Sequence, residues 1–147
     1  MGANLLTTPT LLCDILTALR TALPSRVAIS AKIRLLPSQD DTLALVRRII
    51  NTGVSCLTVH CRTKEMRNRE KALIYRLRDI VECVEGMGLG VPVIANGDCL
   101  SRDDAERLRA ETGEWLSRSS HQKGNVEHLK ASLASFRSSF SHDRHCR

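Results

Sequence analysis

The stretch Leu57-Thr58-Val59-His60-Cys61-Arg62-Thr63 has the pattern of a short buried strand that ends in polar or reactive groups. Two similar stretches flank it. Residues 27–34 precede it and end with a lysine and an arginine, and residues 91–98 follow it and end with an amide, a glycine and a carboxylate. Helical patterns separate the three stretches, so the sequence predicts consecutive βα units with parallel strands. We expect their polar groups to gather at the carboxyl ends of these strands.

Alternation within residues 27–35 predicts which strand face each side chain occupies. Ile29, Ile33 and the other odd-numbered residues share one face, and Lys32 and Arg34 share the other. In a βα barrel one strand face meets the helices and the other points into the barrel. We therefore expect Lys32 to point inward, close to the barrel mouth.

Four helical patterns surround the three strand patterns. A Thr8-Pro9 start opens the first helix, and its apolar residues at helical spacing predict one buried face, made of Leu12, Ile15, Leu16, Leu19 and Leu23. An aspartate in the loop at residues 37–41 is expected to cap the second helix, and Ser101 the fourth. Thr52-Gly53 and Thr112-Gly113 end the second and fourth helices.

The alternation of helical and strand patterns along the chain stops after Gly113. The next residues contain too few apolar side chains for a buried parallel strand, so we expect no strand there. We divide the chain into a partial barrel at residues 1–113 and a divergent tail at residues 114–147, which we expect to be irregular or helical, with disorder left open. With 147 residues in all, the chain is shorter than the roughly 250 of a complete barrel. The predicted fold class is therefore α/β, a partial TIM (β/α)8 barrel of about three to four units.

Composition and charge narrow the class of protein. The net charge of +6 fits an anionic partner, although solubility explains it equally well. The six cysteines show no CxxC pairing and no zinc-like spacing with histidine, so we expect reduced thiols and no bound metal. No run approaches the roughly 20 apolar residues of a membrane span. We expect a cytoplasmic protein and leave a nuclear location open.

Each polar group at a strand end has a functional and a structural interpretation. Lys32 either faces an anionic or carbonyl-rich ligand or merely extends its head into solvent. His60 either bonds a ligand or is a satisfied core histidine, and Asn96-Gly97-Asp98 either approaches a phosphate or forms a plain turn. The conjunction of all three at the same end of successive strands favours a binding site.

The loop at residues 62–71 is mostly basic. Arg62, Arg67 and Arg69 are candidates for contact with nucleic-acid or cofactor phosphates, and the alternative is a solvated loop. Arg62 and His60 are expected on the same side of their strand. Cys61 then points the other way, which argues against it as a nucleophile.

The strand ends resemble a known family. Ala31-Lys32-Ile33-Arg34, Thr58-Val59-His60-Cys61-Arg62-Thr63 and Val93-Ile94-Ala95-Asn96-Gly97-Asp98 occur in the order and spacing of the tRNA-dihydrouridine synthases. They look most like the eukaryotic subgroup that modifies tRNA position 20. The similarity covers about residues 1–113.

This resemblance implies a flavoprotein oxidoreductase with an FMN-bearing TIM barrel, which reduces uridine to dihydrouridine in the tRNA D-loop. NADPH is the implied reductant and tRNA the implied RNA partner. Lys32 and His60 would contact the flavin or the substrate base, and Asn96, Gly97 and Asp98 would line the cofactor end near the ribityl phosphate. Extrusion of the uracil is implied, because a stacked base cannot lie on the flavin.

The sequence also departs from the family pattern. No cysteine matches the family's catalytic cysteine, so no catalytic residue is assigned, and the family's phosphate grip is replaced from Glu114 onward. We expect a truncated form of the enzyme and leave open whether it is active or inactive. Two alternatives stay open: another FMN- or phosphate-binding barrel oxidoreductase acting on a small molecule, and a non-catalytic RNA-binding fragment.

Overall fold

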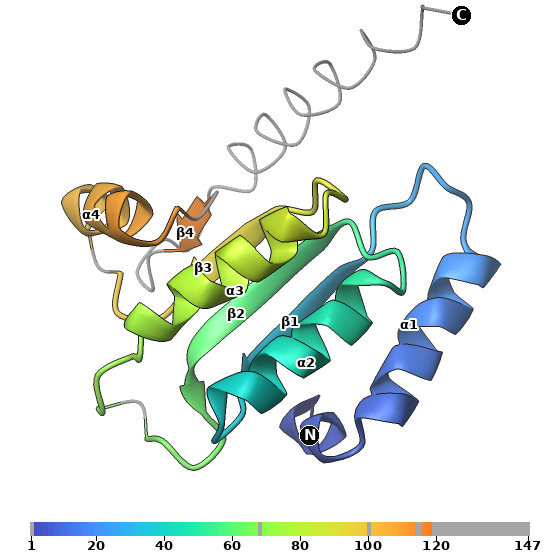
Figure 1. The fold of residues 1–147 in the computed structure, drawn as a ribbon, viewed down its shortest axis with the longest axis horizontal. Coiled ribbons are helices and arrows are strands. Elements are labelled where there is room, and N and C mark those ends of the chain that lie inside the picture. The colour runs from blue at the N-terminus through green and yellow to red at the C-terminus, as the bar shows by residue number, and fades with distance from the viewer. Residues whose placement is uncertain (1, 68, 100, 114–115, 119–147) are drawn as a thin grey trace, which may run out of the picture.

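The structure, a computed structural model, describes residues 2–67, 69–99, 101–113 and 116–118. Helices and strands alternate along the chain, as Figure 1 shows. In order, they are the short 3-10 helix η1 (Gly2–Thr7), α1 (Pro9–Ala22), β1 (Ser30–Leu35), α2 (Gln39–Ile50), β2 (Cys56–Thr63), α3 (Tyr75–Gly86), β3 (Val93–Asn96), α4 (Arg102–Thr112) and β4 (Leu116–Arg118).

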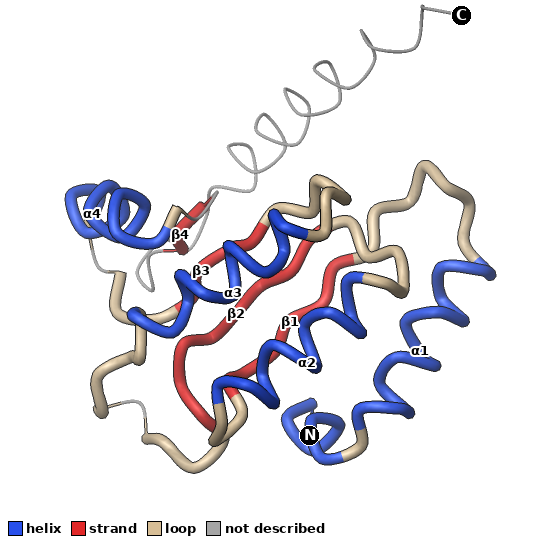
Figure 2. The backbone as a smooth tube through the Cα atoms, viewed as in Figure 1, coloured by secondary structure: helices blue, strands red, loops and turns tan. Residues whose placement is uncertain are grey.

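The strands form one parallel sheet in the order β1-β2-β3-β4. Figure 2 shows α2 and α3 lying across the same face of this sheet, with α1 beside α2. We call this the helix face, and the opposite side the inner face. The α/β class and the parallel order of the strands predicted from the sequence are confirmed.

The core lies between the helix face and the two helices that cover it. Leu57, Val59 and Cys61 of β2 are fully buried, and they alternate along the strand as predicted. Burying a Leu, Val or Ile side chain stabilises the fold by about 1.5–3 kcal/mol relative to leaving it exposed. The helices contribute matching apolar stripes, made of Leu45, Val46, Ile49 and Ile50 on α2 and Leu77, Ile80, Val81 and Val84 on α3.

The helix ends follow local chemistry, with one correction. Ser101 caps α4 in a reciprocal capping box with Asp104, as expected, and Gly113 ends α4 at a φ of 71°. At α2 the cap is Ser38 and not an aspartate, because the Ser38 hydroxyl accepts the Asp41 N–H at 3.3 Å. The aspartates instead occupy the first turn of α2, where the helix dipole favours negative charge.

The predicted buried face of α1 is largely wrong. Leu16 is buried and Leu12 partly so, whereas Ile15, Leu19 and Leu23 are 37–42% exposed. The reason is geometric: in the described fold α1 packs against η1 and α2, and Leu16 is the residue of this helix that becomes buried. An apolar stripe on this helix and its C-cap is therefore exposed, made of Leu11, Ile15, Leu19 and Leu23.

The expectation that no strand follows Gly113 is also wrong. The backbone of β4 pairs in parallel with β3, with Asn96 opposite Arg118. A three-residue strand on a sheet edge is defined by its backbone hydrogen bonds and does not require the apolar pattern of a buried strand. The predicted tail beyond it, residues 119–147, lies outside the described residues, and the boundary at 113 stays a prediction.

Candidate cofactor site at the strand ends

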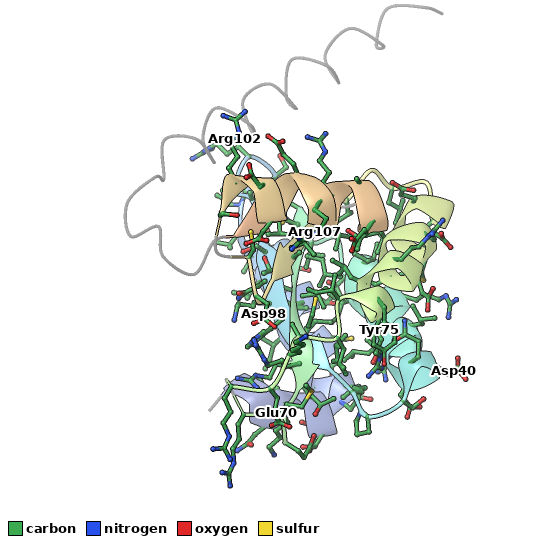
Figure 3. All side chains as sticks on the ribbon, turned by 90° about the vertical axis from the view of Figure 1, so that its left-hand side faces the viewer. Asp40, Glu70, Tyr75, Asp98, Arg102 and Arg107 are labelled. Atoms are coloured by element: carbon green, nitrogen blue, oxygen red, sulfur yellow. The ribbon has the colours of Figure 1, made fainter. Side chains whose placement is uncertain are left out.

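Three predicted site residues share the inner face of the sheet. Lys32 alternates with the buried Ala31 and Ile33, which face the helices. His60 lies between the buried Val59 and Cys61, and Asn96 follows the buried Ala95. Because neighbouring strands are paired in register, side chains of the same parity point to the same side. Figure 3 shows Asp98, which follows β3, on the opposite side from Tyr75 and Asp40 at the helix ends.

Register separates Lys32 from the other two residues. Arg34, His60 and Asn96 are register partners across β1, β2 and β3, whereas Lys32 pairs with Thr58. Strands lie about 4.8 Å apart and two residues advance about 6.6 Å, which puts the Cα atoms of Lys32 and Asn96 about 12 Å apart. Only a ligand that extends across all three strands reaches both.

Arg34 is a further candidate site residue that the sequence-based list omits. It lies level with His60 and closer to the strand end than Lys32 does. Its Nη1 donates to the Thr63 carbonyl at 3.1 Å, which holds the half-buried guanidinium beside the end of β2. The alternation that placed Lys32 inward also places Arg34 there, so the signal was present in the sequence.

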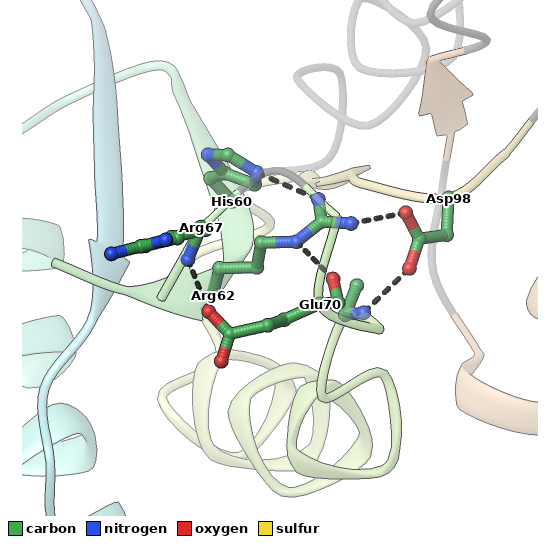
Figure 4. A network of polar contacts seen from close by, with 6 residues as sticks. His60, Arg62, Arg67, Glu70 and Asp98 are labelled. Atoms are coloured by element: carbon green, nitrogen blue, oxygen red, sulfur yellow. Dashed lines mark hydrogen bonds and ion pairs between the residues drawn. The ribbon is translucent and has the colours of Figure 1, made fainter. Parts of the chain in front are cut away.

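Arg62 is buried and makes three separate contacts. Its Nε donates to the Glu70 carbonyl at 2.7 Å, its Nη1 lies 3.2 Å from His60 Nε2, and its Nη2 forms an ion pair with Asp98. Figure 4 shows the guanidinium between the imidazole and the carboxylate. These contacts join the end of β2, the basic loop and the end of β3. The three contacts of the guanidinium are thus all with other residues of this chain. The phosphate contact predicted for Arg62 from the sequence is not among them.

The turn after β3 is shaped to receive Arg62. Asp98 has a φ of 47°, and its second carboxylate oxygen accepts the Ala72 N–H at 2.5 Å. Gly97 has a φ of 136°, and a Cβ there would lie 3.1 Å from the Cβ of Ala72. Glycine thus allows the β3 turn to approach the basic loop closely.

Opposing effects set the acidity of Asp98. Desolvation raises the pKa of its carboxyl group. The hydrogen bonds from Ala72 and Arg62, together with the Arg62 charge, outweigh desolvation and bring the pKa below its ordinary value. Asp98 is therefore an ionised carboxylate that pairs with Arg62, and it is not placed to act as a proton donor.

His60 is biased toward its neutral form. Burial lowers the pKa of its imidazole first of all, and the positive charges of Arg34, Lys32 and Arg62 lower it further. The Asp98 carboxylate acts in the opposite direction and is outweighed. The inner face thus combines a neutral imidazole with several cations.

The basic loop presents two of its predicted contact residues to solvent. Arg67 and Arg69 are exposed, and the Arg67 backbone N–H donates to the Glu70 carboxylate. Because the Glu70 carbonyl also accepts from Arg62, the loop is tied to the strand end beneath it. Arg67 and Arg69 therefore belong to a loop whose base is anchored beside His60.

Two cavities occur elsewhere in the described part of the chain. One, of about 320 Å³, lies between the end of α3 and the start of β3, and the other, of about 390 Å³, lies between η1 and α2. Lys32, His60 and Asn96 line neither of them. Among the described residues no helix is long and apolar enough to span a membrane, and no group of three or more His, Cys, Asp or Glu side chains could hold a metal ion.

The alternating helices and parallel strands, with polar side chains at the strand ends, define part of a TIM-type βα barrel. Comparison with known families makes this specific. The family model of dihydrouridine synthase (Dus) matches residues 1–115, and the chain belongs to this family.

Individual relatives agree with the family match. The chain is 38% identical over 143 residues to the tRNA-dihydrouridine(20) synthase (NAD(P)+) of Schizosaccharomyces pombe, covering 93% of this chain and 29% of the relative. It is 43% identical over 112 residues to the protein of the same name from Saccharomyces cerevisiae, covering 75% and 29%. A tRNA-dihydrouridine(16) synthase of Ralstonia nicotianae is 38% identical over 116 residues, covering 76% and 33%. The chain thus spans about a third or less of the length of these curated relatives.

Proposed function

We propose that this chain forms the cofactor-contacting strand ends of a flavin-dependent tRNA-dihydrouridine synthase, which reduces uridine in tRNA with NADPH through FMN. The observation that carries the proposal is the common inner face of Lys32, His60 and Asn96 in a chain of the dihydrouridine synthase family. The names of the relatives, which include tRNA and NAD(P)+, support the substrate and the reductant.

The donor groups of the inner face fit FMN. Lys32 and Arg34 are cations, and the flavin ring and its phosphate offer carbonyl, ring-nitrogen and phosphate acceptors. Lys32 would bond the polar edge of the ring, and His60 would contact the ring or the uracil. Asn96, Gly97 and Asp98 would line the phosphate end, with Asp98 acting through Arg62. When bound, FMN would supply the hydride that NADPH delivers to it.

The exposed arginines of the basic loop are proposed to meet tRNA. Arg67 and Arg69 reach solvent beside the site, and contacts to phosphates release counterions, so tRNA binding should weaken steeply with salt. No proton donor is assigned to the chain. Cys61 is buried on the helix face and so does not face the proposed site. A cytoplasmic location is part of the proposal, supported by Cys13, Cys56 and Cys83, none of which forms a disulfide.

Flavin titration of the full chain tests this proposal. We expect FMN to bind, and Lys32→Met to weaken binding about 10-fold or more, because a charged hydrogen bond to the ring is lost. Lys71→Met is the matched control, since this exposed lysine lies on the basic loop and should leave FMN affinity unchanged. Quenching of flavin fluorescence measures the affinity. Absence of FMN binding by the wild-type chain, or equal affinities of the two variants, would overturn the proposal.

A further inference from the structure

Two contacts hold the guanidinium of Arg62 independently of His60. The Glu70 carbonyl accepts from Nε, Asp98 pairs with Nη2, and only 6% of the residue is exposed. A planar guanidinium anchored at two of its nitrogens has little freedom to rotate. Its Nη1 therefore reaches His60 Nε2, 3.2 Å away, in a fixed direction.

The chemistry of arginine decides what His60 can be. A guanidinium has N–H donors and no acceptor, so the imidazole nitrogen facing it must be the unprotonated acceptor. A neutral imidazole with an unprotonated Nε2 carries its proton on Nδ1. Turning the ring over would place its Cε1–H group against Arg62 and lose the hydrogen bond. In a doubly protonated ring, the Nε2–H would face the Nη1–H of Arg62, so that two donors would meet without an acceptor.

We propose that Arg62 is a positioning residue that fixes His60 as the neutral tautomer with its proton on Nδ1. The ring nitrogen Nδ1 points away from Arg62 in Figure 4. His60 therefore offers its ligand a hydrogen-bond donor and no acceptor.

The charges around the ring support the same state. Burial and the cations Lys32 and Arg34 on β1, with Arg62 on β2, lower the pKa of His60, while Asp98 after β3 opposes them. These neighbours favour the neutral imidazole at neutral pH but do not distinguish its two tautomers. The hydrogen bond from Arg62 makes that distinction.

A consequence follows for ligand selection. Lys32, Arg34 and the Nδ1–H of His60 would together form a wall of donors, while Asn96 beside them both donates and accepts. The ligand edge that meets this wall must be made of acceptors, such as carbonyl oxygens, unprotonated ring nitrogens or phosphate oxygens. This step rests on the proposed function, whereas the tautomer itself does not.

Nitrogen NMR of the ¹⁵N-histidine-labelled full chain tests the tautomer, with His60→Gln to assign the signals. At pH 7 we expect Nε2 of His60 at the shift of an unprotonated nitrogen and Nδ1 at that of a protonated one. The reverse pattern, or a protonated ring, would overturn the proposal. This measurement needs no folded variant of Arg62.

Two variants separate positioning from charge. Arg62→Met removes the donor and should shift the ring toward the Nε2–H tautomer. Arg34→Met removes a nearby cation that does not bond the ring, so it should raise the pKa of His60 and leave the tautomer unchanged. An unchanged tautomer in a folded Arg62→Met chain would contradict the proposal. FMN titration of the same samples is independent: failure to bind FMN removes the proposed function and leaves the tautomer assignment intact.

Discussion

The helix face and the inner face of the sheet share one backbone but differ in the burial and the polarity of their side chains. On the helix face, Leu57, Val59 and Cys61 are fully buried and apolar. On the inner face, the intervening His60 and its neighbours Lys32 and Arg34 are polar and partly or fully exposed. The difference teaches that the fold is specified by one set of alternating residues, which leaves the other set available for chemistry. Each face can therefore be perturbed separately.

The largest effect is expected on the helix face. Leu57→Ala should lower the free energy of unfolding by about 2–5 kcal/mol, because Leu57 is fully buried and its truncation leaves a cavity. Thr58→Ala, on the next residue and the opposite face, is the matched control and should cost about 1 kcal/mol or less. Urea unfolding measures both. Equal losses would show that the two faces do not differ in their contribution to stability.

An intermediate effect is expected at the ion pair between Arg62 and Asp98, on the inner face of the sheet. Asp98→Ala should lower the free energy of unfolding by about 1–3 kcal/mol at pH 7, since it leaves the buried Arg62 without its ion pair and frees the Ala72 N–H. Asp103→Ala, an exposed acid in the first turn of α4, should cost about 1 kcal/mol or less. Chemical denaturation of the two variants provides the comparison. A loss no greater than that of Asp103→Ala would mean that the Arg62 ion pair is not structural.

The smallest effect is the pH dependence that His60 adds. Its pKa in the fold is below the ordinary value of about 6.5, so the unfolded chain binds the proton more tightly. The contribution of neutral His60 to the free energy of unfolding is therefore present above about pH 6.5, and it is lost as the pH falls toward the pKa of His60 in the fold. Unfolding measured from pH 7.5 to pH 5 should therefore decline more steeply for the wild type than for His60→Gln. Parallel curves would contradict the lowered pKa.

Side-chain alternation made much of this architecture predictable. The odd and even residues of the first strand were assigned to the correct faces, because a period of two is a property of the strand itself. The opposite directions of His60 and Cys61 followed from the same rule. Capping by Ser101 was predictable for a similar reason, since its partners lie within three residues.

Apart from the Ser38 cap of α2, which is a local error, the features that the sequence analysis missed depend on distant parts of the chain. The burial of α1 depends on which elements lie against it, and its stripe of leucines alone does not reveal that only one side is covered. The pairing of Arg62 with Asp98 spans 36 residues and requires the register of two strands. The strand β4 depends on backbone groups of β3 and not on its own composition.

The exposed stripe of α1 has a consequence for handling the protein. Leu11, Ile15, Leu19 and Leu23 recur at every fourth position along α1 and its C-cap, and they are large apolar side chains exposed to water. The isolated chain should therefore bind hydrophobic dyes such as ANS while still folded, and should be retained on apolar chromatography resins. Mild detergent or low ionic strength, which weaken apolar adsorption, are the conditions in which the strand-end chemistry is best measured.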